Sequence, residues 1–470
     1  MNRADSGNGR KLAALCLVQF MIVLDQSIAN IALPTIGTDL AMPASMLQWV
    51  VSAYSLLLAS FLIVGGRMGD GMGHRNTLLA GLVVFTVCSL VAGITDSGIM
   101  LIVMRGGQGL GAALMSPSIL ALIALLHADP AERGKAFAAF GGVSALGFSS
   151  GTLLGGLLTE YLGWRSVFLI NIPIGLMACA FCLRFIQNKV YSAAPASVNA
   201  LNATLAVAGI ALVLNVVTQY NGEAMQLPTF GFALAGGAAL LAFAWREKAS
   251  ANPIIPRGFL LENRPLVAAS VSGALFGASI AGALYLVTIY LQSVLKLSPS
   301  HTGLSLLPHA LVVVPSSVVM AKLMPRFGPE RLLAFGLFVM TIGLALMLPI
   351  RPTGSYWIEV LPATLLMGVA VAAMMVCGST MATHGLPENA QGLATGIFTT
   401  SQHMGVTVGL VLCTALSGMM DMTLSGASND ALTGGLNQVL LTAIVFAALA
   451  LLACLGIRSS AKAVSVGGAQ

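Results

Sequence analysis

Charged residues are scarce in this sequence. Asp, Glu, Lys and Arg together make up 8% of its 470 residues, whereas a soluble globular protein contains about a quarter. Apolar residues make up 57%, and the mean hydropathy is +0.91. A soluble protein of this length could not cover so much apolar surface with so few charges. The composition therefore excludes a soluble enzyme, a disordered chain and a nucleic-acid-binding protein.

Enzyme motifs and metal-ligand spacings are also missing. The chain has no Walker loop, no HExxH pair and no nucleophile elbow, which excludes transport driven by ATP bound to this chain. Cys179 and Cys182 lie three residues apart but have no second Cys or His pair, so we predict no metal site and no cofactor. The apolar runs do not alternate as the strands of a β-barrel would. An all-α polytopic membrane protein remains.

Apolar runs long enough to cross a bilayer fill most of the chain. A spanning helix needs about 20 residues, and we predict fourteen transmembrane helices. They lie roughly at 12–36, 48–68, 77–95, 99–126, 134–158, 166–187, 199–218, 228–245, 266–292, 303–323, 331–350, 357–380, 391–418 and 436–457.

Lys and Arg gather in alternate connections between these runs. With the N-terminus in the cytoplasm, the outer segments contain only Arg165, Lys296 and Arg351. Cytoplasmic segments are enriched in Lys and Arg, so both termini are predicted to be cytoplasmic. This asymmetry requires an even number of helices but does not separate fourteen from twelve.

An internal repeat favours fourteen. The fifth and thirteenth runs align on one register: Gly134 with Gly392, Ala136 with Ala394, Phe140 with Phe398, Gly147 with Gly405, and Gly151 with Gly409. Parallel six-helix repeats would match the fifth helix with the fifth helix of the second half, six helices further along the chain. The observed match is eight helices further along, so two helices have been inserted between the halves. We predict six-helix bundles at 1–190 and 251–470, with two inserted helices at 191–250. Such repeats are typical of transporters whose substrate site lies between the halves.

Asp25 and Arg105 are the charged residues that lie well inside predicted spans. A charge inside the bilayer is costly and is by default a candidate functional residue. The alternatives are a structural ion pair or an Arg that reaches the interface. We predict that Asp25 binds and releases a proton and that Arg105 modulates its proton affinity.

Polar residues in the spans are candidates for a substrate cavity. Near the two charges these are Gln26, Asn30 and Gln108, the last of which shares a helix face with Arg105. No acid lies mid-span in the second half. The polar candidates there are Tyr285, Tyr290, Gln292, His309, Gln402 and His403. A lone His such as His309 is more often a hydrogen-bonded structural group than a titrating one.

Glycines repeat along one face of the fifth run. Gly147, Gly151 and Gly155 are four residues apart, and Gly156 is adjacent. Small residues at this spacing predict close contact with another helix, either for packing alone or as a sliding interface.

Several ordered motifs resemble the major facilitator superfamily, in particular its fourteen-helix drug:proton antiporter branch. They are Leu24–Pro34, Gln48–Tyr54, Gly66–Arg75, Arg105–Ala113, Gly147–Gly156 and Trp164–Gly175. The Gly66–Arg75 segment keeps Gly66, Asp70, Gly73 and Arg75 of the family's cytoplasmic loop motif. It has Gly71 and His74 where basic residues are usual, and Thr152 replaces the usual Pro of the antiporter motif.

The resemblance implies a proton-coupled exporter of small hydrophobic compounds or drugs, with Tyr54 on the cavity side and Asp70 and Arg75 in a gating loop. The first alternative is a narrow-specificity metabolite exporter or permease on the same fold; the second is a membrane sensor or polytopic enzyme. A single membrane acid favours a neutral or anionic substrate over a cation. We expect no enzymatic activity and no nucleic-acid partner. We expect a monomer in the cytoplasmic membrane of a bacterium, with the proton as the coupling ion.

Overall fold

The fold consists of helices. The computed structural model describes residues 3–467 except 48, 128, 188–199, 220–226, 251, 252, 257, 298, 349, 353 and 418–428. Helices of the first part are α1 (Arg3–Asp39), α2 (Ala44–Leu47), α3 (Trp49–Met72), α4 (His74–Ile94), α5 (Gly98–Leu126), α6 (Pro130–Leu162), α7 (Arg165–Leu169), α8 (Asn171–Phe185), α9 (Ala200–Gln219) and α10 (Leu227–Ala249).

The second part adds α11 (Phe259–Glu262), α12 (Arg264–Ile289), α13 (Pro299–Phe327), α14 (Pro329–Ala345), α15 (Leu361–Ala373), α16 (Ser379–Thr383), α17 (Gln391–Ser417) and α19 (Asn429–Gly467). Short π-helices η1 (Tyr290–Val294), η2 (Tyr356–Val360) and η3 (Met374–Gly378) continue these helices, and η4 (Glu388–Ala390) is a 3₁₀ turn. The all-α prediction is confirmed over the described residues.

Eleven helices of the described chain are long and apolar enough to cross a membrane. Each coincides with one of the predicted spans. The other three predicted spans fall on α9, on the 17-residue α14 and on α17. The count of fourteen transmembrane helices stays a prediction.

The chain forms two compact units. Unit 1 contains residues 1–211, 239–256 and 385–397, and unit 2 contains residues 212–238, 257–384 and 398–470. The predicted three-part division stays a prediction, and its boundary at residue 190 lies outside the described residues.

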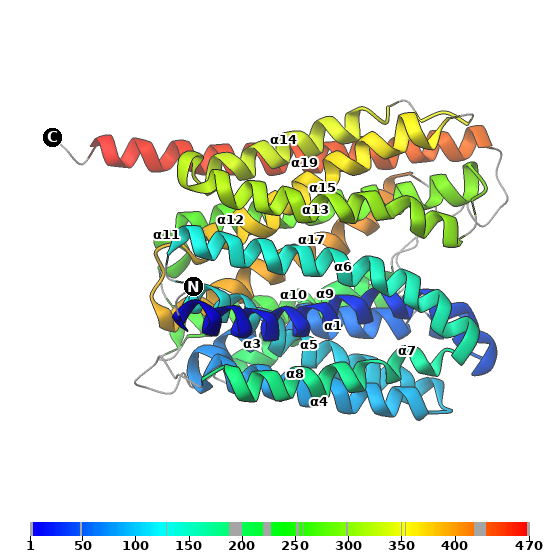
Figure 1. Cartoon of the computed structure of the whole chain (residues 1–470), viewed down its shortest axis with the longest axis horizontal. Coiled ribbons are helices and arrows are strands. Elements are labelled where there is room, and N and C mark those ends of the chain that lie inside the picture. Colours follow the sequence, from blue (N-terminus) through cyan, green and yellow to red (C-terminus); the bar gives the residue numbers. More distant parts are fainter. Residues whose placement is uncertain are drawn as a thin grey trace. The chain divides into compact units, whose positions relative to one another are not determined.

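The predicted glycine face packs against α1 in unit 1. α1 runs along α6, while α3 and α4 both pack on α5 (Figure 1). Gly147 lies against the backbone of Phe20, Gly151 against Leu24 and Ser27, and Gly155 against Ile28. Gly156 faces open space. Because a side chain on the first three glycines would meet α1, the two helix axes can approach closely.

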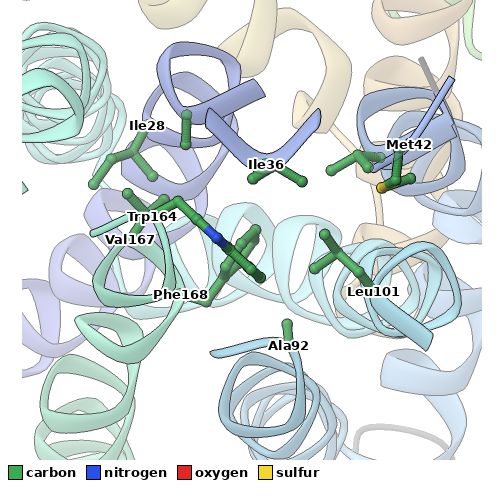
Figure 2. Close-up of a cluster of buried hydrophobic side chains, with 10 residues drawn as sticks. Ile28, Ile36, Met42, Ala92, Leu101, Trp164, Val167 and Phe168 are labelled. Carbon is green, nitrogen blue, oxygen red and sulfur yellow. The ribbon is translucent and has the colours of Figure 1, made fainter. Parts of the chain in front are cut away.

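An apolar cluster fills one end of unit 1. Figure 2 shows Ile28 and Ile36 of α1 beside Trp164, Val167 and Phe168 of α7 and its preceding turn. Leu101 of α5 and Ala92 of α4 complete this side, and the rings of Trp164 and Phe168 meet edge to face at 6.0 Å.

An exposed ion pair borders the cluster. Trp164 Nε1 and Arg165 Nη1 each donate to Asp39 Oδ2 over 2.8 Å. These bonds from Trp164 and then Arg165 lower the pKa of Asp39. Their stabilising effect is present above the unfolded-state pKa and is lost as the pH falls through the folded-state value.

One predicted loop is almost entirely helical. α3 continues to Met72 and α4 begins at His74, so Gly73 alone connects them, with φ of 91°. The predicted spans ended at 68 and began at 77, which placed Asp70 in a loop; that boundary is wrong. Polar and Gly residues mark a membrane boundary in sequence, but nothing prevents the helix from continuing beyond it.

In unit 2, α12 packs along α19, and α15 packs between α13 and α14 (Figure 1). η1 extends α12, while η2 and η3 flank α15. π-helical turns are rare and occur frequently at functional sites. Their positions mark the ends of α12 and α15 as places where the regular helix is interrupted.

Alanine substitutions test the glycine face. A Cβ on Gly151 would overlap Ser27 Oγ and lie 2.8 Å from the carbonyl oxygen of Leu24. Gly151→Ala should therefore destabilise the protein by about 1–3 kcal/mol and lower its thermal unfolding midpoint in detergent. Gly156→Ala is the matched control on the same helix and should leave the midpoint unchanged or raise it, because Ala favours helix over Gly. Equal effects of the two substitutions would contradict this packing.

Candidate functional site

Asp25 and Arg105 form a buried ion pair in unit 1. Asp25 lies on α1 and Arg105 on α5, and Arg105 Nη1 is 2.6 Å from Asp25 Oδ2. The side chains are 0% and 1% exposed. Two opposite charges at this distance offset much of each other's desolvation cost, whereas either charge alone would be strongly unfavourable.

Further donors complete the environment of the carboxylate. Gln108 Nε2 donates to Asp25 Oδ1 over 3.1 Å, and Asn171 Nδ2 donates to the same oxygen over 2.8 Å. Gln108 Nε2 also donates to Ser89 Oγ over 2.7 Å. The Asp25 carboxylate thus joins α1 directly to α5 and α8. It reaches Ser89 of α4 through Gln108.

Arg105 has its own fixed partners. Its Nε donates to the carbonyl oxygen of Val50 over 2.9 Å, and its Nη1 donates to Gln108 Oε1 over 3.0 Å. The guanidinium carbon lies 4.5 Å from the ring centre of Tyr54 and 5.9 Å from that of Phe168. A cation over an aromatic face is attracted by the ring, so the cation keeps partners even without Asp25.

The predicted site residues of unit 1 divide into two groups. Arg105 and Gln108 contact Asp25. Tyr54 lies against Arg105, and Gln26 Nε2 lies 3.5 Å from Tyr54 Oη. Asn30 is exposed, and its amide donates to the carbonyl oxygen of Gln26 one turn earlier on α1. The sequence analysis missed Asn171 and Ser89 as partners. The signal for Asn171 was its place in the Trp164–Gly175 motif; nothing distinguished Ser89.

The predicted cavity residues of unit 2 lie on separate elements. Tyr285 is on α12, Gln292 on η1, His309 on α13 and Gln402 on α17. No hydrogen bond between described residues joins two of these four. His309 Nδ1 is 3.0 Å from the carbonyl oxygen of Thr364, so this nitrogen carries the hydrogen and the ring is held in place. His309 therefore has the structural contact expected of a lone buried His.

Asp70 caps a helix within unit 1. It is 1% exposed, and its two carboxylate oxygens accept the backbone N–H groups of Gly392 and Leu393, each over 2.8 Å. These donors belong to the first turn of α17, where backbone N–H groups lack helical partners and favour a negative charge. Gly66 is in backbone contact with Gly392.

His74 and the predicted gating residue Arg75 have different partners. His74 Nε2 lies 3.3 Å from Asp70 Oδ1, close enough for an ion pair but not aligned for a hydrogen bond. Arg75 instead donates to the carbonyl oxygen of Leu183 on α8 over 3.1 Å. Asp70 and Arg75 therefore act on different helices.

The chain belongs to the Major Facilitator Superfamily, whose family model matches residues 15–410. It is a multi-pass membrane protein of this transporter family. It is 32% identical over 415 residues to the puromycin resistance protein pur8 of Streptomyces alboniger, covering 86% of this chain and 81% of that one. It is also 32% identical over 412 residues to the cephamycin export protein CmcT of Amycolatopsis lactamdurans, covering 87% and 84%.

Solved structures share the fold. The human organic anion transporter MFSD10 aligns with a TM-score of 0.66 at 15% identity, over 94% of this chain and 99% of that chain. The proton:xylose symporter XylE aligns with a TM-score of 0.65 at 14% identity, over 93% and 95%. The superfamily resemblance predicted from the motifs is confirmed.

Removing one charge at a time tests the ion pair. Arg105→Gln leaves the buried Asp25 carboxylate without its cation and should cost about 3–5 kcal/mol, seen as a lower thermal unfolding midpoint of the purified protein. Adding Asp25→Asn to that variant removes the stranded charge and should restore most of the loss. Additive effects of the two substitutions would contradict direct coupling between the charges.

Proposed function

We propose that the chain is a proton-coupled exporter of small, mostly hydrophobic compounds. The single observation that carries this proposal is the buried Asp25–Arg105 pair, which places a titratable carboxyl group inside a membrane span. The relatives of the chain include pur8 and CmcT. Ionisable groups inside membrane helices mark proton and substrate pathways.

The contacts suggest how a proton would act. Protonation of Asp25 removes the negative charge from the pair, and Arg105 then keeps Val50, Gln108 and Tyr54 as partners. The new carboxyl O–H needs an acceptor. Asn171 Oδ1 is buried without a hydrogen-bond partner among the described residues, and rotation of this amide would present that oxygen to Asp25. Both protonation states can thus be satisfied with small side-chain movements.

The remaining features of the proposal follow from the sequence. The internal repeat supports fourteen spans. The distribution of Lys and Arg supports cytoplasmic termini in a bacterial cytoplasmic membrane. Asp70 would stabilise one conformation through its contact with the start of α17. We propose that the protein acts as a monomer, without a cofactor or metal and without enzymatic activity.

A narrow-specificity exporter or permease is the second candidate. CmcT is named as a cephamycin export protein, and under this second proposal the chain would export one class of compound. The distinction concerns the range of substrates and leaves the proton site unchanged.

Accumulation assays test the proposal. Cells that lack their main efflux pumps would express the wild type or Asp25→Asn. They would receive a lipophilic cationic dye, the amine antibiotic puromycin, neutral antibiotics and an organic acid. Wild type should lower the accumulation of at least one compound, and a protonophore should abolish the effect. Asp25→Asn should reduce export by at least about tenfold, which corresponds to about 1.4 kcal/mol.

Glu160→Gln is the matched control, since it also neutralises an acid of unit 1 but at an exposed position at the end of α6. It should export like wild type at equal membrane abundance. Normal export by Asp25→Asn would overturn the role of the pair. Export of a single compound class would favour the narrow exporter, and no export of any compound would contradict the drug-exporter proposal.

A further inference from the structure

His403 has an unused polar side chain near the middle of α17. Its side chain is half-buried, and no hydrogen bond between described residues involves its ring. The ring nitrogens of His74 are enclosed without a hydrogen-bond partner, whereas those of His403 reach open space. An imidazole in an apolar span needs hydrogen-bond partners, so the His403 ring is free to bind a molecule that enters this space.

The contact between α17 and α12 lies on another face of α17. A Cβ on Gly405 would meet the backbone of Ala274, and a Cβ on Gly409 would meet Ala278. Each residue of an α-helix turns by about 100°. His403 therefore lies about 160° around the helix from Gly405 and is not part of the contact with α12.

The face of α17 that contains His403 is turned toward other helices at its start. Gly396 precedes His403 by two turns on this face, and within unit 1 a Cβ there would lie 2.9 Å from the carbonyl oxygen of Leu62 of α3. The neighbouring Thr395 Oγ1 donates to the carbonyl oxygen of Pro117 of α5 over 3.0 Å. This face is therefore an interior face of the protein rather than a lipid-facing one.

The cover over α17 ends just before His403. Residues 391–400 are all buried, whereas residues 401–404 are half-buried. Thr400 Oγ1, one turn before His403, is buried without a hydrogen-bond partner among the described residues. Two unpartnered polar side chains thus follow one another where the interior face of α17 opens.

The elements that contact this part of α17 contain no nearby charge. Phe398 packs on Gly273 of α12 and Gly378 of η3. Neither α17 nor η3 contains Asp, Glu, Lys or Arg, and α12 has only Arg264, at its first residue. A charged group that left water here would find no opposite charge to offset its desolvation. Uncharged polar groups on an apolar molecule fit these surroundings.

We propose that His403 binds the transported compound and selects uncharged compounds that carry a hydroxyl, carbonyl or amide group on an apolar frame. A neutral imidazole has one N–H donor and one acceptor nitrogen, so it can pair with each of these groups. This inference rests on the proposed function and adds a substrate class to it, while Asp25 keeps its role in coupling.

Binding to the purified full-length protein in lipid nanodiscs tests the role of His403. The probes are chloramphenicol, cycloheximide and hydrocortisone, which are uncharged and carry hydroxyl, carbonyl or amide groups. Wild type should bind at least one of them in isothermal titration calorimetry. His403→Leu should raise its Kd by about tenfold, because a polar group of the bound compound is left unpaired. His403→Gln should stay within about threefold of wild type, since its amide offers both a donor and an acceptor.

His384→Leu is the matched control, because it is the same substitution at an exposed position of unit 2. It should bind the probe like wild type. His403→Leu should also keep the wild-type thermal unfolding midpoint, since the ring has no protein partner to lose. Binding of no probe by wild type, or an unchanged Kd in His403→Leu, would overturn the proposal. A lowered midpoint with equal loss of binding in His403→Gln would also overturn it, because it would reveal a structural role.

Asp25→Asn separates this inference from the proposed function. It should bind the probe with the wild-type Kd but fail to export it. If the accumulation assay shows no proton-coupled export while His403→Leu still weakens binding, the export proposal fails and the binding role of His403 stands. If export is observed but His403→Leu binds the probe like wild type, only the role of His403 fails.

Discussion

The ion pair between Asp25 and Arg105 is the interaction on which the interior of unit 1 depends. Through direct hydrogen bonds it joins α1, α3, α5 and α8, and through Gln108 it reaches Ser89 on α4. An apolar helix interior tolerates these buried charges only with their polar partners in place. Each helix that supplies a partner is therefore held at a defined position.

The burial of these charges also makes the site sensitive to protonation of Asp25. A change of one proton on Asp25 alters the net charge of a buried cluster. The Val50 carbonyl and the Tyr54 ring keep Arg105 in place during such a change. The response is then expected in the partners of Asp25, above all Asn171 on α8, and in the packing of α1 against the glycines of α6.

The two charges could be predicted from the sequence because each interrupts a long apolar run. A charge inside the membrane has a high energetic cost, so its presence there is a strong signal. The sequence did not reveal Asn171 or Ser89, since a small polar residue in a span is common and its partner lies on a distant helix. The prediction of a loop at Asp70 is wrong for a related reason. The polar and Gly residues around it are typical of a loop, whereas its buried contact with Gly392 and Leu393 depends on a distant helix.

Proton release on substrate binding is the most direct test of the central claim that Asp25 is the coupling site. A compound that wild-type cells export in the accumulation assay would be added to purified protein in weakly buffered detergent solution, and the change in pH would be recorded. The account predicts that wild type releases protons on binding, whereas Asp25→Asn binds the compound without release. The same proton release from both proteins would contradict it.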